Sequence, residues 1–140
     1  MFPDFNKKFI VEHDAFYKEL KKWRLEFLDK QEKNECVYVL KSIKPVPRVL
    51  KTDEDGILYI GKGLLTKNHE RIGELINSVN SKDSKQHEAG EKYQRIRESF
   101  EIEGLSLYIY LKDDSREEEE KYLKEYLEEF GELPPLNRQA

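Results

Sequence analysis

The spacing of apolar residues along the chain changes between two periods, and each period predicts one type of element. Four stretches have apolar residues at helical spacing and predict helices, over residues 13–33, 66–79, around 91–100 and 116–130. Three stretches are dense in β-branched, aromatic and other apolar residues and predict strands, over residues 36–43, 57–63 and 105–112. Ser115 is expected to cap the last helix, and Gly131 with the prolines of "LPPLN" to end it.

The order of these elements predicts an α+β fold. The first two strands are joined by "KPVPRVLKTDEDG", in which two prolines and the Asp55-Gly56 turn signal indicate a connection between hairpin strands. Helices separate this hairpin from the third strand, so the sheet packs against a layer of helices. We therefore predict a small three-stranded antiparallel sheet flanked by helices, with an extra N-terminal helix. Residues 1–34 are expected to form a helical extension, and residues 35–140 a single compact unit.

Composition narrows the class of protein. The chain has 140 residues, enough for one domain with a modest core. Charged residues make up 39%, but an aromatic content of 11% excludes a disordered chain and indicates a core of Tyr, Phe and Leu. Apolar runs are short and the start lacks the features of a secretory signal, so we expect no membrane contact. The single cysteine, Cys36, excludes an intramolecular disulfide and a Cys-based zinc site, and it favours the cytoplasm.

The charges are distributed unevenly. The net charge is −4, yet residues 101–140 hold five Lys and Arg against twelve Asp and Glu, whereas residues 1–100 hold twenty against seventeen. A phosphate-binding face is therefore compatible with the first hundred residues, while the acidic end faces water.

The stretch "ILYIGKG" at residues 57–63 ends a predicted strand in glycines that flank Lys62. Glycines allow a close approach to the backbone, and a lysine offsets phosphate charge. The spacing GxxxxGK[ST] is absent, which excludes a nucleotide P-loop. Phosphate contact and a solvated loop position remain equal alternatives for Lys62.

The motifs from Cys36 to Asn137 resemble those of the GIY-YIG nucleases. "CVY" at 36–38 stands at the first name-giving tripeptide, "YIG" at 59–61 matches the second, Arg71 follows, and an acidic helix precedes "LPPLN". Cys36 replaces the family's glycine, and twenty residues between the two tyrosines exceed its usual short hairpin. The resemblance implies a metal-dependent endonuclease that hydrolyses DNA phosphodiester bonds with a tyrosine-activated water and one Mg²⁺ or Mn²⁺ ion.

The resemblance also assigns roles to residues. Tyr38 or Tyr59 would take a proton from water, and Arg71 would stabilise the charge on the scissile phosphate. Glu119, on the inner stripe with the apolar residues of its helix, would hold the metal ion, with Glu120 as the fallback. The remaining assignments are to a loop histidine and two residues near the site: His87 in proton transfer or phosphate contact, Gly61 in opening the pocket, and Asn137 in hydrogen bonds that hold the chain end beside it.

Each assignment has a structural alternative. The tyrosines are also typical of a half-buried sheet, Arg71 of a helix surface, and His87 of an exposed loop. The N-terminal helix lies outside the resemblance and would pack on the sheet, contact DNA, or bind a second copy or a partner subunit. An inactive nucleic-acid-binding or protein-interaction module with the same fold is the rival interpretation.

Overall fold

The computed structural model describes most of the chain. The described residues are 2, 4–11, 16–28, 35–65, 72, 74–76, 79, 88–97 and 104–137, without the side chains of 27–28 and 88–91. Within them the fold is α+β, as predicted: a four-stranded antiparallel sheet, a two-stranded hairpin and helices on both faces of the sheet. In this part of the chain, no helix is long and apolar enough to cross a bilayer.

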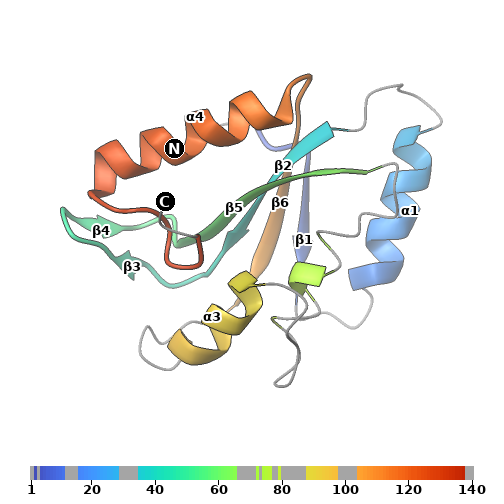
Figure 1. Cartoon of the computed structure of the whole chain (residues 1–140). Coiled ribbons are helices and arrows are strands. Elements are labelled where there is room, and N and C mark those ends of the chain that lie inside the picture. Colours follow the sequence, from blue (N-terminus) through green and yellow to red (C-terminus); the bar gives the residue numbers. More distant parts are fainter. Residues whose placement is uncertain are drawn as a thin grey trace.

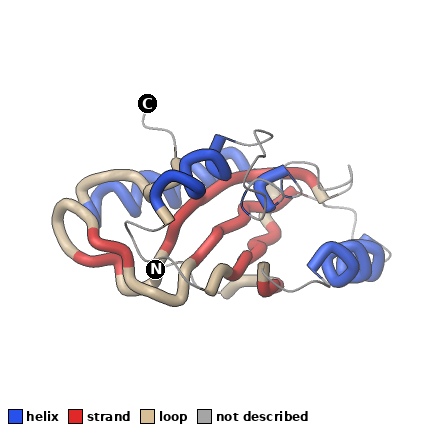
Figure 2. The backbone as a smooth tube through the Cα atoms, turned by 90° about the horizontal axis from the view of Figure 1, so that it is seen from below, coloured by secondary structure: helices blue, strands red, loops and turns tan. Residues whose placement is uncertain are grey.

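The sheet has one strand more than the sequence predicts. Its strands lie in the order β1-β6-β2-β5 and are side by side in Figure 2; they are β1 (Lys7–Ile10), β6 (Ser106–Leu111), β2 (Glu35–Lys41) and β5 (Ile57–Leu64). The prediction of three strands is therefore wrong, because it omits the edge strand β1, which pairs antiparallel with β6. Four residues are too few for a reliable periodicity, and the pairing with β6 completes this strand.

The helices match the predicted stretches with shifted ends. They are α1 (Phe16–Leu28), α3 (Glu88–Ile96) and α4 (Ser115–Phe130). In the predicted helix 66–79, the described residues are helical, and the four apolar ones are buried: Ile72, Leu75, Ile76 and Val79.

The C-terminal end of α4 is as predicted, whereas its N-cap is not. Gly131 ends the helix in the left-handed region, with φ at 80°, as expected. The N-cap is Asp114 rather than Ser115, because the Asp114 side chain accepts a hydrogen bond from the Glu117 N–H at 3.1 Å. The Ser115 hydroxyl instead donates to Glu35 at 3.1 Å, which ties the helix to the start of β2.

The sheet separates two apolar clusters, because successive side chains of a strand point to opposite faces. On one face, Cys36, Tyr38 and Leu40 of β2 pack with α1, α3 and the helical residues of 72–79. On the other, Val37 and Val39 pack with α4. Figure 1 shows α4 on one side of the sheet and α3 on the other.

The connection between β2 and β5 contains the hairpin of β3 (Val46–Pro47) and β4 (Thr52–Asp53). Asp53 is fully buried, and its carboxyl group accepts hydrogen bonds from the Asp55 and Ile57 N–H groups at 2.9 and 3.0 Å. The hydroxyl of Tyr126, on α4, donates to the same group at 2.8 Å. This carboxyl group therefore joins the hairpin, the start of β5 and α4.

Replacing Tyr126 by Phe tests this junction. The substitution removes one donor from a buried carboxyl group, so we expect the free energy of unfolding to fall by about 1–3 kcal/mol. Urea denaturation measures the change. Leu127→Ala, at an exposed position on the same helix, is the control and should cost less than about 0.5 kcal/mol. Equal stability of Tyr126→Phe and wild type would show that the junction contributes nothing.

Candidate functional site

The edge strand β5 is held by a side chain from the end of the chain. The amide of Asn137 makes two hydrogen bonds to Ile60: its oxygen accepts from the Ile60 N–H at 3.0 Å, and its nitrogen donates to the Ile60 carbonyl at 2.9 Å. The Leu136 N–H donates to the Leu58 carbonyl at 2.9 Å. A side-chain amide thus takes the place of a neighbouring strand in the middle of the Tyr-Ile-Gly tripeptide. Asn137 thus ties its segment of the chain to the edge strand β5.

The two tyrosines lie on one face of the sheet, around a glycine. Tyr38 is directly opposite Gly61, and Tyr59 is opposite Leu40, so the tyrosines are diagonal neighbours. Their ring centroids are 6.1 Å apart, with 36° between the planes. A Cβ atom at position 61 would lie 2.7 Å from an atom of each ring. The absence of a side chain at Gly61 is therefore a condition for this pair of rings.

The tyrosines differ in access to solvent. Tyr38 is only 1% exposed, whereas Tyr59 is half-buried against the cluster that contains Tyr38. In this arrangement, Tyr59 is the tyrosine that a molecule in solution can reach.

Lys62 and Glu119 lie on the other face. Lys62 is opposite Val37, which packs with α4, and its side chain is exposed. Glu119 is half-buried on α4; burial raises the pKa of its carboxyl group, the charge of Lys62 lowers this pKa, and the charge of Glu120 raises it. Lys62 is thus the cation that favours ionisation of Glu119.

Glu120 points away from this region. Its side chain is 65% exposed and pairs with Arg116, with 3.4 Å between Nε and Oε1. Of the two candidate metal ligands, Glu119 is therefore the one near the sheet.

The sequence-based site residues thus form two groups rather than one. The tyrosines lie on the face of α1 and α3, and Lys62 with Glu119 on the face of α4. Both groups include residues of the edge strand β5, with Tyr59 and Gly61 on one face and Lys62 on the other. Arg71 and His87 lie outside the described residues.

Further main-chain groups of β5 point to this edge beyond the Asn137 contact. Backbone groups of an edge strand point alternately toward its neighbour and outward. The Ile60 N–H and carbonyl point outward, because they bind Asn137. By alternation, those of Lys62 also point outward, between two residues without side chains, Gly61 and Gly63.

Glu119 fits only one kind of metal site. In the described part of the chain, no group of three or more His, Cys, Asp or Glu side chains is placed to hold an ion. A single carboxylate suits a hard ion such as Mg²⁺ when waters and phosphate oxygens supply the other ligands. Glu119 matches this one-carboxylate arrangement.

Cys36, at the position where the GIY-YIG motif has a glycine, has an unreactive thiol. It is fully buried, and burial raises the pKa of its thiol to about 12. Its Sγ donates a hydrogen bond to the Gly63 carbonyl at 3.5 Å. The thiol is therefore neutral at physiological pH and contributes packing next to Tyr38, not a nucleophile.

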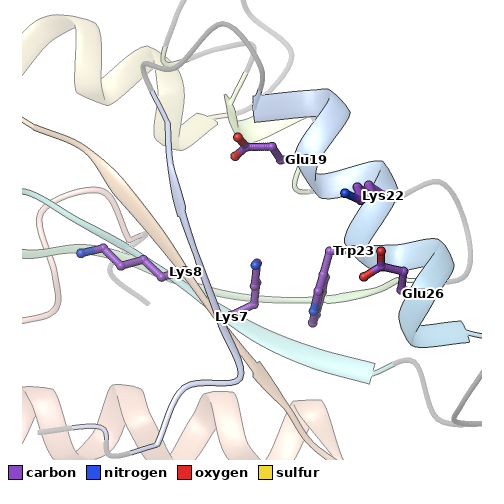
Figure 3. A pocket seen from close by; sticks show the side chains of 6 residues that line it. All are labelled: Lys7, Lys8, Glu19, Lys22, Trp23 and Glu26. Carbon is purple, nitrogen blue, oxygen red and sulfur yellow. The ribbon is translucent and has the colours of Figure 1, made fainter.

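A separate hollow of about 260 Å³ lies between β1 and α1. Figure 3 shows Trp23 extending from α1 toward Lys7, whereas Lys8 leaves β1 on the opposite side. The other lining residues are Glu19, Lys22 and Glu26. Sequence reasoning did not find this hollow; the Lys7-Lys8 pair beside Phe9 was its only signal. With lysines and glutamates both present, its charge favours neither anions nor cations.

Comparisons with known proteins add no further assignment. The chain matches no protein-family model, and no curated protein or solved structure is significantly similar to it.

Gly61→Ala should disturb the tyrosine pair, whereas Gly63→Ala should not. The new Cβ at 61 would meet ring atoms of Tyr38 and Tyr59 at 2.7 Å, but the one at 63 meets only a Tyr38 ring atom at 3.5 Å, an ordinary contact. We expect Gly61→Ala to lower the free energy of unfolding by about 1–3 kcal/mol. Gly63→Ala should stay within about 1 kcal/mol of wild type. Chemical denaturation compares the two, and equal effects would refute the role of Gly61.

Glu119→Gln should stabilise the protein in a pH-dependent way. Because the folded-state pKa of Glu119 is raised, the folded protein holds its proton more tightly than the unfolded chain. Ionisation therefore costs stability, with no cost below the ordinary pKa and the full cost above the raised one. Thermal melting should show a higher Tm for Glu119→Gln near neutral pH and no difference near about pH 4. Glu120→Gln is the exposed control, and an equal gain in both variants would contradict this account.

Proposed function

We propose that this chain is a metal-dependent endonuclease of the GIY-YIG type that hydrolyses DNA phosphodiester bonds. The observation that carries the proposal is the Tyr-Ile-Gly edge of β5, where the Asn137 amide holds Ile60 and the rings of Tyr38 and Tyr59 pack around Gly61. The motif residues that are far apart in the sequence thus meet at one strand.

The proposed substrate position is the outer edge of β5 at residues 61–63. A phosphate group there can approach the backbone closely, because Gly61 and Gly63 have no side chains. Tyr59 would reach it from one face of the sheet, and Lys62 and Glu119 from the other. At this edge, groups on both faces of the sheet would act on the same phosphate.

The proposed chemistry is hydrolysis with Tyr59 as the general base. Its phenolate oxygen would take a proton from water while the water oxygen bonds to phosphorus and the bond to the leaving oxygen breaks. Tyr59 is favoured over Tyr38 because Tyr38 is 1% exposed. A nearby cation stabilises a phenolate, and we assign this role to Arg71.

Charge stabilisation completes the proposal. Arg71 would donate paired hydrogen bonds to the phosphate oxygens. Glu119 would hold a Mg²⁺ or Mn²⁺ ion, which when bound offsets negative charge on those oxygens.

A non-catalytic binding module is the second candidate. It is favoured by the separation of the tyrosines from Lys62 and Glu119, which lie on opposite faces of the sheet, and by the burial of Tyr38. Such a protein would use the same fold to bind nucleic acid or another protein without cleaving a bond.

A plasmid-nicking assay separates the two candidates. Supercoiled DNA is incubated with wild type in Mg²⁺ or Mn²⁺ and with Glu119→Gln, Tyr59→Phe, Arg71→Ala and the control Glu120→Gln. We expect nicking by wild type and Glu120→Gln, and a loss of about 10²–10⁴-fold in Tyr59→Phe. Glu119→Gln and Arg71→Ala should also lose activity.

Other results reassign or reject the roles. Full activity of Glu119→Gln and Arg71→Ala would overturn the site, and loss in Glu120→Gln alone would move the metal ligand by one residue. A gel shift by wild type without nicking would favour the binding module.

A further inference from the structure

Helix α4 covers only part of its face of the sheet. It packs on β5 and β2, and its Tyr122 ring contacts that of Tyr110 on β6. Toward β1, the same face carries Lys8 and Ile10 on β1 and Tyr108 on β6, with Phe5 beside them. Ile10 is 55% exposed and Phe5 47%, so this region is open to solvent. We call it the open half of the sheet, defined by Phe5, Lys8, Ile10, Lys41 and Tyr108.

Tyr108 lies at the centre of the open half. Its ring is half-buried, with Phe5 edge-on at a centroid distance of 4.8 Å. The Nζ atoms of Lys41 and Lys8 lie 4.4 and 5.3 Å from its centroid. Both ammonium groups therefore lie over the ring, so a base can stack on Tyr108 only when these groups turn from the ring to phosphates.

The arrangement follows from the order of the strands. Lys8 on β1 is directly opposite Tyr108 on β6, and Lys41 comes from β2, the next strand. Figure 3 shows the Lys8 side chain leaving β1 on the side away from Trp23, although Lys8 is also among the residues that line the hollow between β1 and α1. A ligand that crosses the strands thus meets a lysine, an aromatic ring and a second lysine in turn.

The charges around the open half are asymmetric. Its charged side chains are the two lysines, Lys8 and Lys41. Toward α4, Glu118, Glu125 and the cation Lys121 act electrostatically on Tyr122, and Asp55 acts on Tyr110 of β6. A polyanion is therefore favoured beside Lys8 and Lys41 rather than near Tyr110 or along α4.

We propose that the open half of the sheet binds single-stranded nucleic acid, with a base stacked on Tyr108 and phosphates on Lys8 and Lys41. Proteins that bind single strands combine basic side chains with exposed aromatic rings on which unpaired bases stack. In a duplex the bases already stack on each other, so Tyr108 has no free base face to contact. The two lysines match the charge of a polyanion, which an apolar protein partner would not need.

The site is distinct from the proposed cleavage edge. Tyr108 is on β6, separated from β5 by β2, and none of the five residues belongs to the cleavage proposal. The inference therefore does not depend on cleavage, and either of the two proposals can fail while the other holds.

Fluorescence anisotropy with a labelled short oligo(dT) tests the inference, at low salt and with EDTA so that no bond is cut. Tyr108→Leu keeps apolar bulk but removes the flat ring, and Tyr108→Phe keeps the ring. We expect Kd to rise at least about fivefold in Tyr108→Leu and to change less than about twofold in Tyr108→Phe. Thermal melting confirms that both variants are folded.

The lysines are tested by salt dependence. In a double variant, Lys8→Gln with Lys41→Gln, the slope of log K against log salt should fall by about 1.4, because each phosphate contact with a single strand contributes about 0.7. Lys51→Gln is the matched control, since Lys51 also lies over a ring, that of Phe130 at 5.4 Å, but outside the open half and paired with Glu129. Its affinity and slope should equal those of wild type.

Three results would overturn the inference: no affinity of wild type for the oligonucleotide at low salt, unchanged affinity of folded Tyr108→Leu, or a salt slope that Lys51→Gln lowers as much as the double variant does. Equal binding of oligo(dT) by Glu119→Gln and wild type is expected. Absence of nicking together with Tyr108-dependent binding would refute the cleavage proposal alone and leave this inference standing.

Discussion

The hydrogen bonds between the Asn137 amide and the Ile60 main chain determine how the edge of the sheet is built. They bring the end of the chain back to β5, where Leu136 also binds Leu58, and the Lys92 ammonium donates to the Asn137 carbonyl at 3.3 Å. An edge strand exposes unpaired backbone groups, and this contact satisfies them as far as Ile60. The next outward-facing groups are those of Lys62, and there we propose that the strand receives a ligand, just beyond the Asn137 contact.

The two-residue period of β5 imposes a second constraint. Alternation places Tyr59 and Gly61 on one face and Ile60 and Lys62 on the other, so no single pocket on either face contains all of them. On the face of the tyrosines, the two rings fill the space beside Gly61, because a Cβ atom there would lie 2.7 Å from an atom of each ring. The face of Glu119 carries a half-buried carboxyl group whose ionisation opposes folding.

The position of α4 divides the other face of the sheet into two environments. Over β5 and β2, the helix buries an apolar cluster and brings Glu119 near Lys62. Over β6 and β1, it leaves Tyr108 with two lysines and exposed apolar side chains. One helix thus gives different surroundings to the two regions for which we propose cleavage and single-strand binding. The strand β2 lies between the two regions and contributes to both.

The sequence by itself determined the class of the fold, the approximate extent of three helices and three strands, and the αL end of α4 at Gly131, because these depend on local spacing and on single residues. It also singled out Tyr-Ile-Gly and Asn137, although not their contact. Local signals could not choose between Asp114 and Ser115 as the N-cap, since both are good caps, and they were too short to identify β1. The period of the strand already separates Tyr59 from Lys62. Tertiary packing alone decided which helix covers each face of the sheet, because residues far apart in the chain compete for the same apolar surface. That packing placed Glu119 near Lys62 and left Tyr108 partly exposed.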